Sequence, residues 1–403
     1  MLYNMAGALM QLVAYGAQDV YLTADPTVTF WKAVYRRHTN FAMESMSQTL
    51  SGTPNFGNKV VCRISRNGDL LHRCYIKATL PALGNTTVAE DTWCNRVGFR
   101  LLKSVELRVG GQQIDKHYAS WMHIWTELTH NTDMKALLDK LVGPKGTDGA
   151  TFDSVTSGTP LLDLNIPLLF SFCRNPGLAL PLIALQYHEI ELWIEFETAA
   201  NCANGTGTGS LSSVELWADY IFLDTEERKE FAQKPHEYLI EVTQQQQASV
   251  TAGTNNSVRL TFNHPTKFIT WAIQETSANN AADVFTNFTT NAAAATAGTT
   301  SCVSQAKIRL NGQDRFSVRD NTYFNYVQPY QHFENKPDLG INVYSFALKP
   351  AEHQPSGSCN LSRIDNVNLE ITPVADGASI DVYAFSYNVF RVASGMGGLA
   401  YSN

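Results

Sequence analysis

Alternating apolar and polar positions are the main pattern of this chain, and they predict β-strands. The clearest stretch starts at His188, where every second residue as far as Phe196 shares one apolar face. The opposite face carries four glutamates and one tryptophan: Glu189, Glu191, Trp193, Glu195 and Glu197. Shorter apolar runs bounded by turn residues predict further strands across the chain. They cover residues 60–64, 70–80, 214–223, 258–262, 267–273, 306–310, 343–348 and 380–392.

One region follows the spacing of an α-helix instead. Trp121, Ile124, Trp125 and Leu128 recur at helical intervals, and the pattern repeats over residues 134–141 before Gly143-Pro144 ends it. Aromatic residues at this spacing usually belong to a core, so we interpret the region as a helical insertion between strands.

Two matching turns organise the rest. Residues 105–113 and residues 306–314 both lead from alternating apolar positions into a two-residue turn followed by Gln. Asn311-Gly312 is a strong hairpin signal, and Gly110-Gly111 is its permissive equivalent, because both dipeptides tolerate the positive φ angles of a type I′ turn.

Three further pairs of segments follow the turns in the same order. Ser171–Pro176 matches Ser345–Pro350, Gln186–Leu192 matches Ile364–Leu369, and Ser213–Ala218 matches Ser379–Ala384. The separation is 201 residues for the turns, 174 for the first of these pairs and 166 for the last, a shortening that loop insertions in one copy would produce. Strands resemble one another, so coincidence remains the alternative, but the order favours two related domains.

The predicted fold is therefore all-β, with two consecutive eight-stranded antiparallel jelly-roll β-sandwiches and a helical insertion in the first. We assign residues 1–24 to an N-terminal arm and 25–223 to the first jelly roll. Residues 224–236, the densest charge run, are expected to form a short helical connector with Glu–Lys pairs. The second jelly roll then covers residues 237–403.

Composition and charge argue against several classes of function and site. Of 403 residues, 17% are charged and the net charge is −7, which argues against an extended nucleic-acid-binding surface. The seven cysteines are widely spaced without a C-x-x-C pair, so we expect reduced thiols rather than disulfides or a zinc site. The first 24 residues have neither the basic start of a signal peptide nor an apolar run long enough to span a membrane.

Candidate chemistry is sparse. Glutamates two apart on a strand lie about 6.5–7 Å from one another, a separation that inverting glycosidases use, but alternating Glu is more often a solvated sheet face. No nucleophile, phosphate-loop, calcium-loop or zinc motif is present, so we expect no catalytic residue, cofactor or metal.

Five Asn residues lie in N-x-[ST] triplets and are glycosylation candidates, although such triplets also arise by chance in Asn- and Thr-rich loops. They are Asn85, Asn204, Asn255, Asn287 and Asn360. Asn287 lies in a long Ala/Asn/Thr loop, 277–301, and is expected to be the best exposed of them.

Residues 12–23, LVAYGAQDVYLT, resemble the opening of the major capsid proteins of large icosahedral DNA viruses that infect algae. Further similar stretches follow collinearly to the C-terminus. They are 41–45 with 58–59, 65–69, 111–118, 176–189, 219–224, 235–241, 263–267, 310–316 and 394–401. The chain is shorter than those relatives around residues 277–301 and 372–379, so glycan positions on these loops do not carry over.

This resemblance implies a double jelly roll, a homotrimer forming a pseudo-hexagonal capsomer, and a virion shell assembled in the host cytoplasm. It also implies minor capsid proteins as partners and covalent glycans on outward loops. The alternative from the fold alone is a glycan-processing or glycan-binding tandem jelly-roll protein, or a host-binding spike.

Overall fold

The computed structural model describes residues 6–81, 93–143, 162–203, 209–274, 285–290, 300–374 and 379–402. The chain divides into two units, Met1–Asn40 and Phe41–Asn403. The N-terminal unit contains helices α1 (Ala6–Val13) and α2 (Val20–Thr23). Its residues 25–40, which sequence reasoning assigned to the first jelly roll, contain no described strand.

The large unit begins with two antiparallel sheets that enclose the first core. One sheet has the order β1-β10-β4-β7, with β8 also on β4, and the other has the order β2-β3-β9-β5-β6. The strands are β1 (Phe41–Gln48), β2 (Leu50–Ser51), β3 (Lys59–Arg63), β4 (Leu70–Leu80), β5 (Leu102–Val109), β6 (Gln112–Tyr118), β7 (Leu162–Pro167), β8 (Leu180–Pro181), β9 (Ile190–Phe196) and β10 (Ser213–Leu223).

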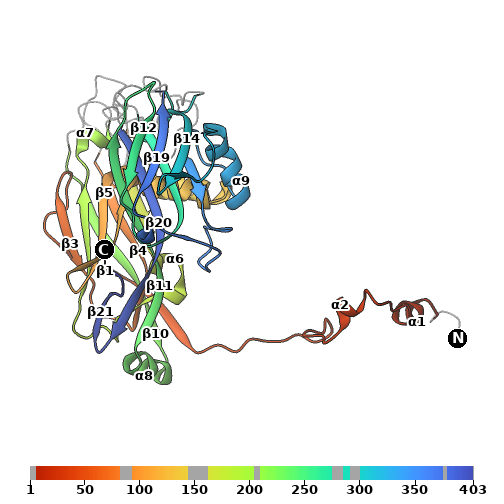
Figure 1. Cartoon of the computed structure of the whole chain (residues 1–403). Helices are drawn as coiled ribbons and strands as arrows, with labels where there is room; N and C mark the ends of the chain where they lie inside the picture. The colour runs from red at the N-terminus through yellow and green to blue at the C-terminus, as the bar shows by residue number, and fades with distance from the viewer. Residues whose placement is uncertain are drawn as a thin grey trace. The chain divides into compact units, whose positions relative to one another are not determined.

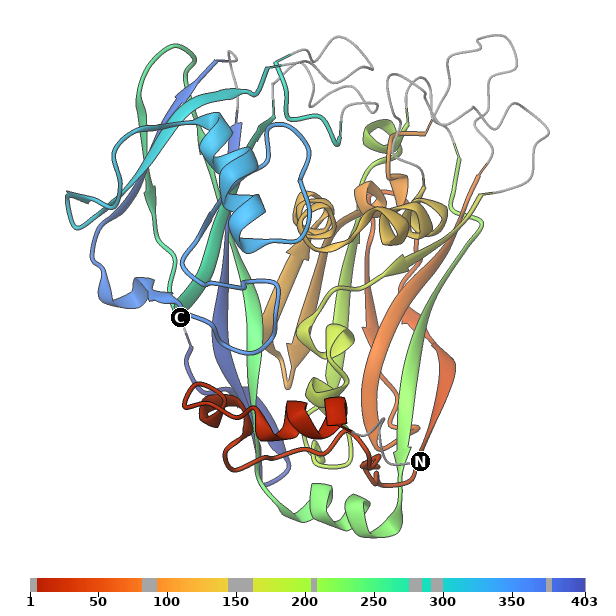
Figure 2. The ribbon, with the colours of Figure 1, turned by 90° about the vertical axis from the view of Figure 1, so that its right-hand side faces the viewer.

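Two more sheets form the second sandwich. Their orders are β11-β20-β13-β17, with β18 and β21 attached, and β12-β19-β14-β15, with β16 attached. The strands are β11 (His236–Ser249), β12 (Asn256–Leu260), β13 (Pro265–Gln274), β14 (Val303–Leu310), β15 (Gln313–Asp314), β16 (Arg319–Asp320), β17 (Asn342–Ser345), β18 (Cys359–Asn360), β19 (Val367–Pro373), β20 (Ser379–Ala393) and β21 (Met396–Leu399). Figure 2 shows the two sandwiches side by side with their long strands running in similar directions.

The two sandwiches have the same topology. When the eight principal strands of each half are numbered along the chain, one sheet has the order 1-8-3-6 and the other 2-7-4-5, in both halves. These are β1, β3, β4, β5, β6, β7, β9 and β10 in the first half, and β11, β12, β13, β14, β15, β17, β19 and β20 in the second. The predicted double jelly roll is confirmed. The repeated turns and the segments at Gln186–Leu192/Ile364–Leu369 and Ser213–Ala218/Ser379–Ala384 fall on equivalent strands, whereas Ser171–Pro176 and Ser345–Pro350 both come at or after the end of strand 6 but only the first forms a helix, α6.

The organising turns occupy the equivalent hairpin in each half, between strands 4 and 5. Gly110, Gly111, Asn311 and Gly312 all have positive φ, between 50° and 82°. The backbone conformation that the dipeptides predicted is therefore present in both copies.

Helices fill the connections. The first half contains α3 (Val97–Leu101), α4 (Ala119–Thr129), α5 (Thr132–Val142), α6 (Ser171–Arg174), η1 (Pro176–Leu178) and α7 (Ala199–Cys202). The second contains the π-helical turn η3 (Tyr323–Val327), α9 (Gln328–His332) and η4 (Leu361–Arg363). The predicted helical insertion corresponds to α4 and α5, whereas η3 and α9, which join strands 5 and 6 of the second half as α4 and α5 do in the first, were not predicted.

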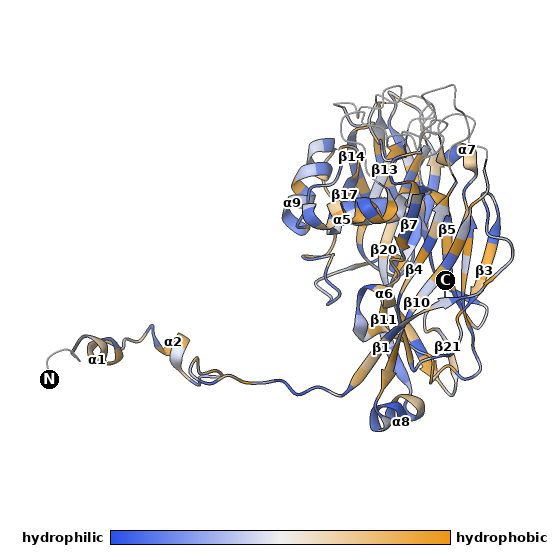
Figure 3. Ribbon diagram, turned by 180° about the vertical axis from the view of Figure 1, so that it is seen from behind, coloured by the Kyte–Doolittle hydropathy of each residue, from blue (hydrophilic) through white to orange (hydrophobic). Residues whose placement is uncertain are grey.

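The connector between the jelly rolls is helix α8 (Thr225–Gln233), as its charge pattern predicted. Lys229 pairs with Glu226 and Lys234 with Glu230, three and four residues apart. Figure 1 shows α8 at the lower end of the strands, and Figure 3 shows that its residues are mainly hydrophilic, in contrast to the apolar residues along the sheets.

No disulfide joins any of the seven cysteines, all of which lie in described residues. Burial raises the pKa of the Cys62 thiol to about 12, so this sulfur stays protonated and unreactive. No helix in the described ranges is long and apolar enough to cross a membrane.

Candidate functional site

The glutamate face of β9 is the one arrangement in which the sequence suggested catalysis. Within β9 burial alternates, with Ile190, Leu192, Ile194 and Phe196 inside and the residues between them half-buried. Glu191 accepts a hydrogen bond from Arg63 Nε at 3.1 Å and another from the Trp193 indole at 2.9 Å. The face is thus a set of mutually paired side chains.

The neighbouring carboxylate is held in its charged form. Lys103 Nζ lies 2.7 Å from Glu195 Oε1, and this hydrogen bond lowers the pKa of Glu195. A general acid needs the opposite shift, because it must hold a proton near neutral pH. Lys59 and Arg108 also lie over the Trp193 ring, 4.7 and 4.2 Å from its centre. This geometry is that of a cross-strand charge ladder.

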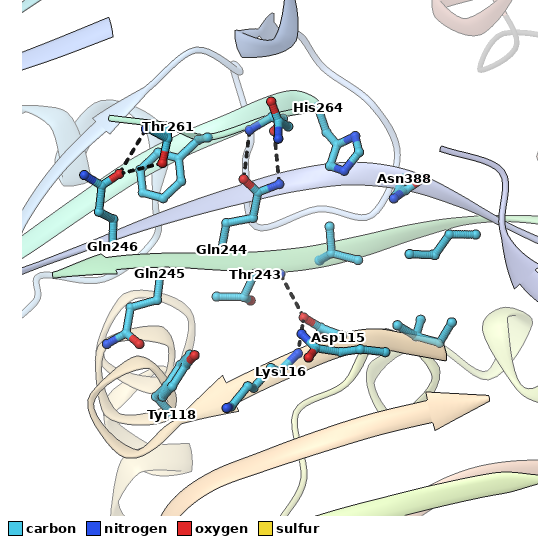
Figure 4. A pocket seen from close by; sticks show the side chains of 16 residues that line it. Asp115, Lys116, Tyr118, Thr243, Gln244, Gln245, Gln246, Thr261, His264 and Asn388 are labelled. Atoms are coloured by element: carbon cyan, nitrogen blue, oxygen red, sulfur yellow. Dashed lines mark hydrogen bonds between the residues drawn. The ribbon is translucent and has the colours of Figure 1, made fainter. Parts of the chain in front are cut away.

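A polar cavity of about 320 Å³ lies where the two jelly rolls meet (Figure 4). On one side Asp115 of β6 accepts a hydrogen bond from the Thr243 backbone of β11 at 2.9 Å. On the other, Gln244 and Gln246 use their side-chain amides to bridge to residues 259–263. Ligand pockets are usually apolar with a few convergent polar groups. Here the polar groups hydrogen-bond to one another. We therefore interpret the cavity as part of the interface between the two jelly rolls, which we call the seam.

Aromatic packing forms the apolar part of the same seam. Trp121 and Trp125 of α4 lie against the outer face of the β11-β20-β13-β17 sheet of the second jelly roll. The Trp125 and Phe385 rings are 4.8 Å apart, and Trp121 lies 5.5 Å from both Tyr383 and Phe385. One continuous core joins these residues to the first sandwich, while the second sandwich encloses a core of its own.

A buried ionic group completes the seam. Glu241 of β11 lies 2.9 Å from Arg174 of α6 and 2.5 Å from Lys267 of β13. Burial lowers the pKa of Lys267, and the adjacent Glu241 carboxylate opposes that shift. Breaking a buried pair leaves an uncompensated charge and costs about 3–5 kcal/mol. The relative position of the two jelly rolls is therefore strongly constrained.

A second buried ionic group lies inside the helical insertion and was missed by the sequence analysis. Arg96 is 1% exposed and reaches Glu127 at 3.2 Å and Asp139 at 3.1 Å, while Lys135 lies 2.7 Å from Glu127. It fastens the start of α3 to α4 and α5. The available sequence signal was a Glu and an Asp on adjacent helices; nothing local marked Arg96 as their partner.

Among the described residues of the jelly rolls, exposed apolar side chains include those of two surfaces. On the first jelly roll, the outer face of the β1-β10-β4-β7 sheet carries Phe41 and Met43, both at least 50% exposed, and the stacked half-buried pair Tyr75–Trp217. On the second, a groove of about 640 Å³ runs along η3 and α9, where the Tyr330 side chain is 89% exposed.

The glycosylation candidates differ in accessibility. Asn255 and Asn360 are exposed, whereas Asn287 is half-buried between the buried Phe285 and Phe288. The expectation that Asn287 is the best exposed is therefore wrong, because its flanking phenylalanines turn inward. Asn85 and Asn204 lie outside the described residues, and glycosylation at all five positions stays a prediction.

Comparison with known proteins agrees with this architecture. A family model described as major capsid protein N-terminus matches residues 29–224, and one described as large eukaryotic DNA virus major capsid protein matches residues 227–398. The major capsid protein of Pyramimonas orientalis virus is 47% identical, and that of Paramecium bursaria Chlorella virus 1 is 42% identical. Each alignment covers 99% of this chain and all of the relative.

Solved structures support the same assignment. A chain of the PBCV-1 virus capsid superposes with a TM-score of 0.79 at 36% identity, over 93% of this chain and all of that one. The Faustovirus major capsid protein shares the fold, with a TM-score of 0.74 at 15% identity and 96% coverage of both chains. These relatives are structural proteins rather than enzymes. The chain therefore belongs to the large eukaryotic DNA virus major capsid protein family and is a structural protein of a virion shell.

Proposed function

We propose that three copies of this chain form a ring of six jelly rolls, a pseudo-hexagonal capsomer that tiles an icosahedral shell. One observation carries the proposal: the two jelly rolls of one chain already pack as neighbours in such a ring would. Helices from the strand 5–6 connection of the first cover the 1-8-3-6 sheet of the second.

Each jelly roll also has the counterpart of a surface that the other uses in this contact, and in the single chain these counterparts are not covered. Trp217 and Tyr383 are each the fifth residue of strand 8, counted from Ser213 and Ser379. Tyr383 is wholly buried by the first jelly roll, whereas Trp217 is only half-buried among the described residues. Likewise, α9 is topologically equivalent to α4–α5 but exposes Tyr330. Repeating the internal contact would place α9 of one chain on the β1-β10-β4-β7 sheet of the next.

Such an interface is heterologous, because the two partners contribute different surfaces. Heterologous contacts close into a ring when the rotation between copies divides a full turn. If each jelly roll occupies one sixth of the ring, three chains close it. The buried aromatic side chains would supply the binding energy, since aromatic residues dominate such interfaces.

Other assignments belong to the same proposal. Residues 41–223 form the first jelly roll, 224–236 the connector and 237–403 the second. The N-terminal unit, whose Phe30 and Trp31 side chains are over 90% exposed, contacts neighbouring chains or minor capsid proteins beneath the shell. Assembly takes place in the host cytoplasm, and covalent glycans attach to outward loops.

The native mass of the purified protein, measured by light scattering after size exclusion, tests the proposal. We expect three times 44.6 kDa for the unmodified chain. Tyr330→Glu places a charge in the proposed contact and is expected to shift the protein to monomers, because losing a central aromatic costs about 2 kcal/mol or more.

Tyr187→Glu is the matched control. Tyr187 is also an exposed tyrosine but lies outside both surfaces, so this variant should remain trimeric. A strictly monomeric unmodified protein at all concentrations would refute the trimer. Trimers that persist in Tyr330→Glu would refute the assignment of α9 to the contact.

A further inference from the structure

Three side chains from both jelly rolls converge beside the aromatic seam. His123 and Glu127 lie one turn apart on α4, and Asp338 lies in the connection between α9 and β17 of the second jelly roll. One potential ligand atom from each lies within 4.8 Å of the others. The capsid function does not account for this grouping.

The spacing suits metal ligands better than a direct hydrogen bond. His123 Nε2 and Asp338 Oδ2 are 3.6 Å apart, which is beyond normal hydrogen-bonding distance. Two ligand atoms each about 2.0–2.1 Å from a tetrahedral metal ion are separated by roughly 3.3 Å. The observed separation therefore needs only a small adjustment for both atoms to bind one ion.

His123 is the independent sign of a missing ligand. Its side chain is wholly buried, and neither ring nitrogen makes a hydrogen bond. Leaving a buried polar group unsatisfied costs about 1–3 kcal/mol. The rings of Phe285 and Phe288 lie 6.1 Å from the imidazole and provide an apolar wall on that side.

The surrounding charges leave room for a cation. Glu127 already contacts Arg96 and Lys135, one through each oxygen, but a carboxylate has about four lone-pair sites. Counting Glu127, Asp338 and Asp139 against Arg96 and Lys135 leaves one net negative charge beside His123. The Asp338 backbone is held in place, since its carbonyl accepts a 2.8 Å hydrogen bond from Asn325.

We propose that His123, Glu127 and Asp338 bind a divalent transition-metal ion that staples the helical insertion of the first jelly roll to the second. One imidazole and two carboxylates form a mixed donor set suited to an ion such as Zn²⁺, and less suited to Mg²⁺, which prefers oxygen ligands and water. Solvent occupies any remaining coordination position through the partly exposed side of Asp338. The site does not depend on trimer formation, because all three ligands belong to one chain.

Metal analysis of the full chain provides the test. Protein dialysed against Zn²⁺ and then against metal-free buffer should retain about one Zn²⁺ per chain by mass spectrometry, and added Zn²⁺ should raise Tm by roughly 2–5 °C. Mg²⁺ at the same concentration should leave Tm unchanged.

His123→Phe and Asp338→Asn should each weaken Zn²⁺ binding by more than about tenfold. Asp338→Asn keeps the side-chain shape at a partly exposed position, so it remains informative if His123→Phe fails to fold. His130→Asn is the control, because His130 is a half-buried histidine near the end of the same helix but outside the cluster. An unmodified chain that retains no Zn²⁺ and shows no Tm shift overturns the proposal. Equal Zn²⁺ binding by Asp338→Asn, or an equal response to Mg²⁺, overturns it as well.

Discussion

The pKa of Asp381, an ionisable side chain between the jelly rolls, is set mainly by burial. Asp381 of β20 lies on the same sheet face as Tyr383, and Gln245 donates a hydrogen bond to it at 3.3 Å. Burial raises the pKa of Asp381 to about 6, and the amide contacts only partly offset this shift. The folded protein therefore holds this proton more tightly than the unfolded chain does.

Asp381→Asn is predicted to stabilise the protein at pH 7.5 but not at pH 3.5. Between the unfolded pKa of 3.8 and the folded pKa of about 6, the unfolded chain loses its proton first, so the wild-type protein loses stability as pH rises. The amide removes that cost, worth about 1–3 kcal/mol above pH 6. Urea unfolding of both proteins at the two pH values measures the difference. A stability difference that does not vary with pH would contradict this assignment.

At the scale of elements, the two organising hairpins share a backbone conformation but differ in their surroundings. At Gly110, with φ +57°, an added Cβ would lie 2.4 Å from the His188 ring. At Gly312, with φ +81°, the same atom would meet nothing within 4 Å. The first turn is packed against the chain, whereas the second is open.

Substitution with alanine should separate the backbone cost of a positive φ angle from the cost of packing against His188. Gly312→Ala introduces only the left-handed backbone cost, about 1–2 kcal/mol. Gly110→Ala adds overpacking against His188, so we expect a total of roughly 2–4 kcal/mol. Chemical denaturation measures both variants. Equal losses would show that His188 moves aside without cost.

Local signals explain which elements were predictable. Turn dipeptides and period-two alternation depend on neighbouring residues alone, so the hairpins and the alternation of β9 were correctly predicted. The spacing of Tyr323, Tyr326, Val327 and Tyr330 also fits a helix, but Pro329 interrupts it, and η3–α9 was missed. Conversely, residues 25–40 were assigned to the first jelly roll, yet no strand forms there.

The candidate sites were less predictable, because they join distant segments. His123 and Glu127 could be read as one helical face, but Asp338 follows more than two hundred residues later. The glutamates of β9 were visible in sequence, whereas their cationic partners Lys103 and Arg63 come from neighbouring strands. Pairing across strands decided between acid–base chemistry and a charge ladder.

At the scale of the molecule, the packing at the seam predicts that the two jelly rolls behave as one cooperative unit. Trp125 is buried and packs against the Phe385 ring of the second jelly roll. The Arg174 guanidinium carbon lies 4.6 Å from the centre of the Trp125 ring. Because this core continues from one sandwich to the other, the two should unfold together.

Trp125→Ala is predicted to destabilise the whole chain by about 3–5 kcal/mol, since removing a buried Trp leaves a large cavity. Leu137→Ala, at an exposed position on α5, should change stability by less than about 0.5 kcal/mol. Calorimetry and urea titration measure the effects. Separate melting of the two jelly rolls in the unmodified protein would contradict the view of a single unit.

The shared strand order has a genetic consequence. Two copies of one fold that are translated as a single polypeptide can mutate independently, unlike six identical copies encoded by one shorter gene. One copy can lengthen a loop or recruit an ion while the other preserves a packing surface. In the proposed ring of three chains, the two jelly rolls would present two alternating kinds of surface to neighbouring capsomers, and selection could change one of these surfaces without altering the other.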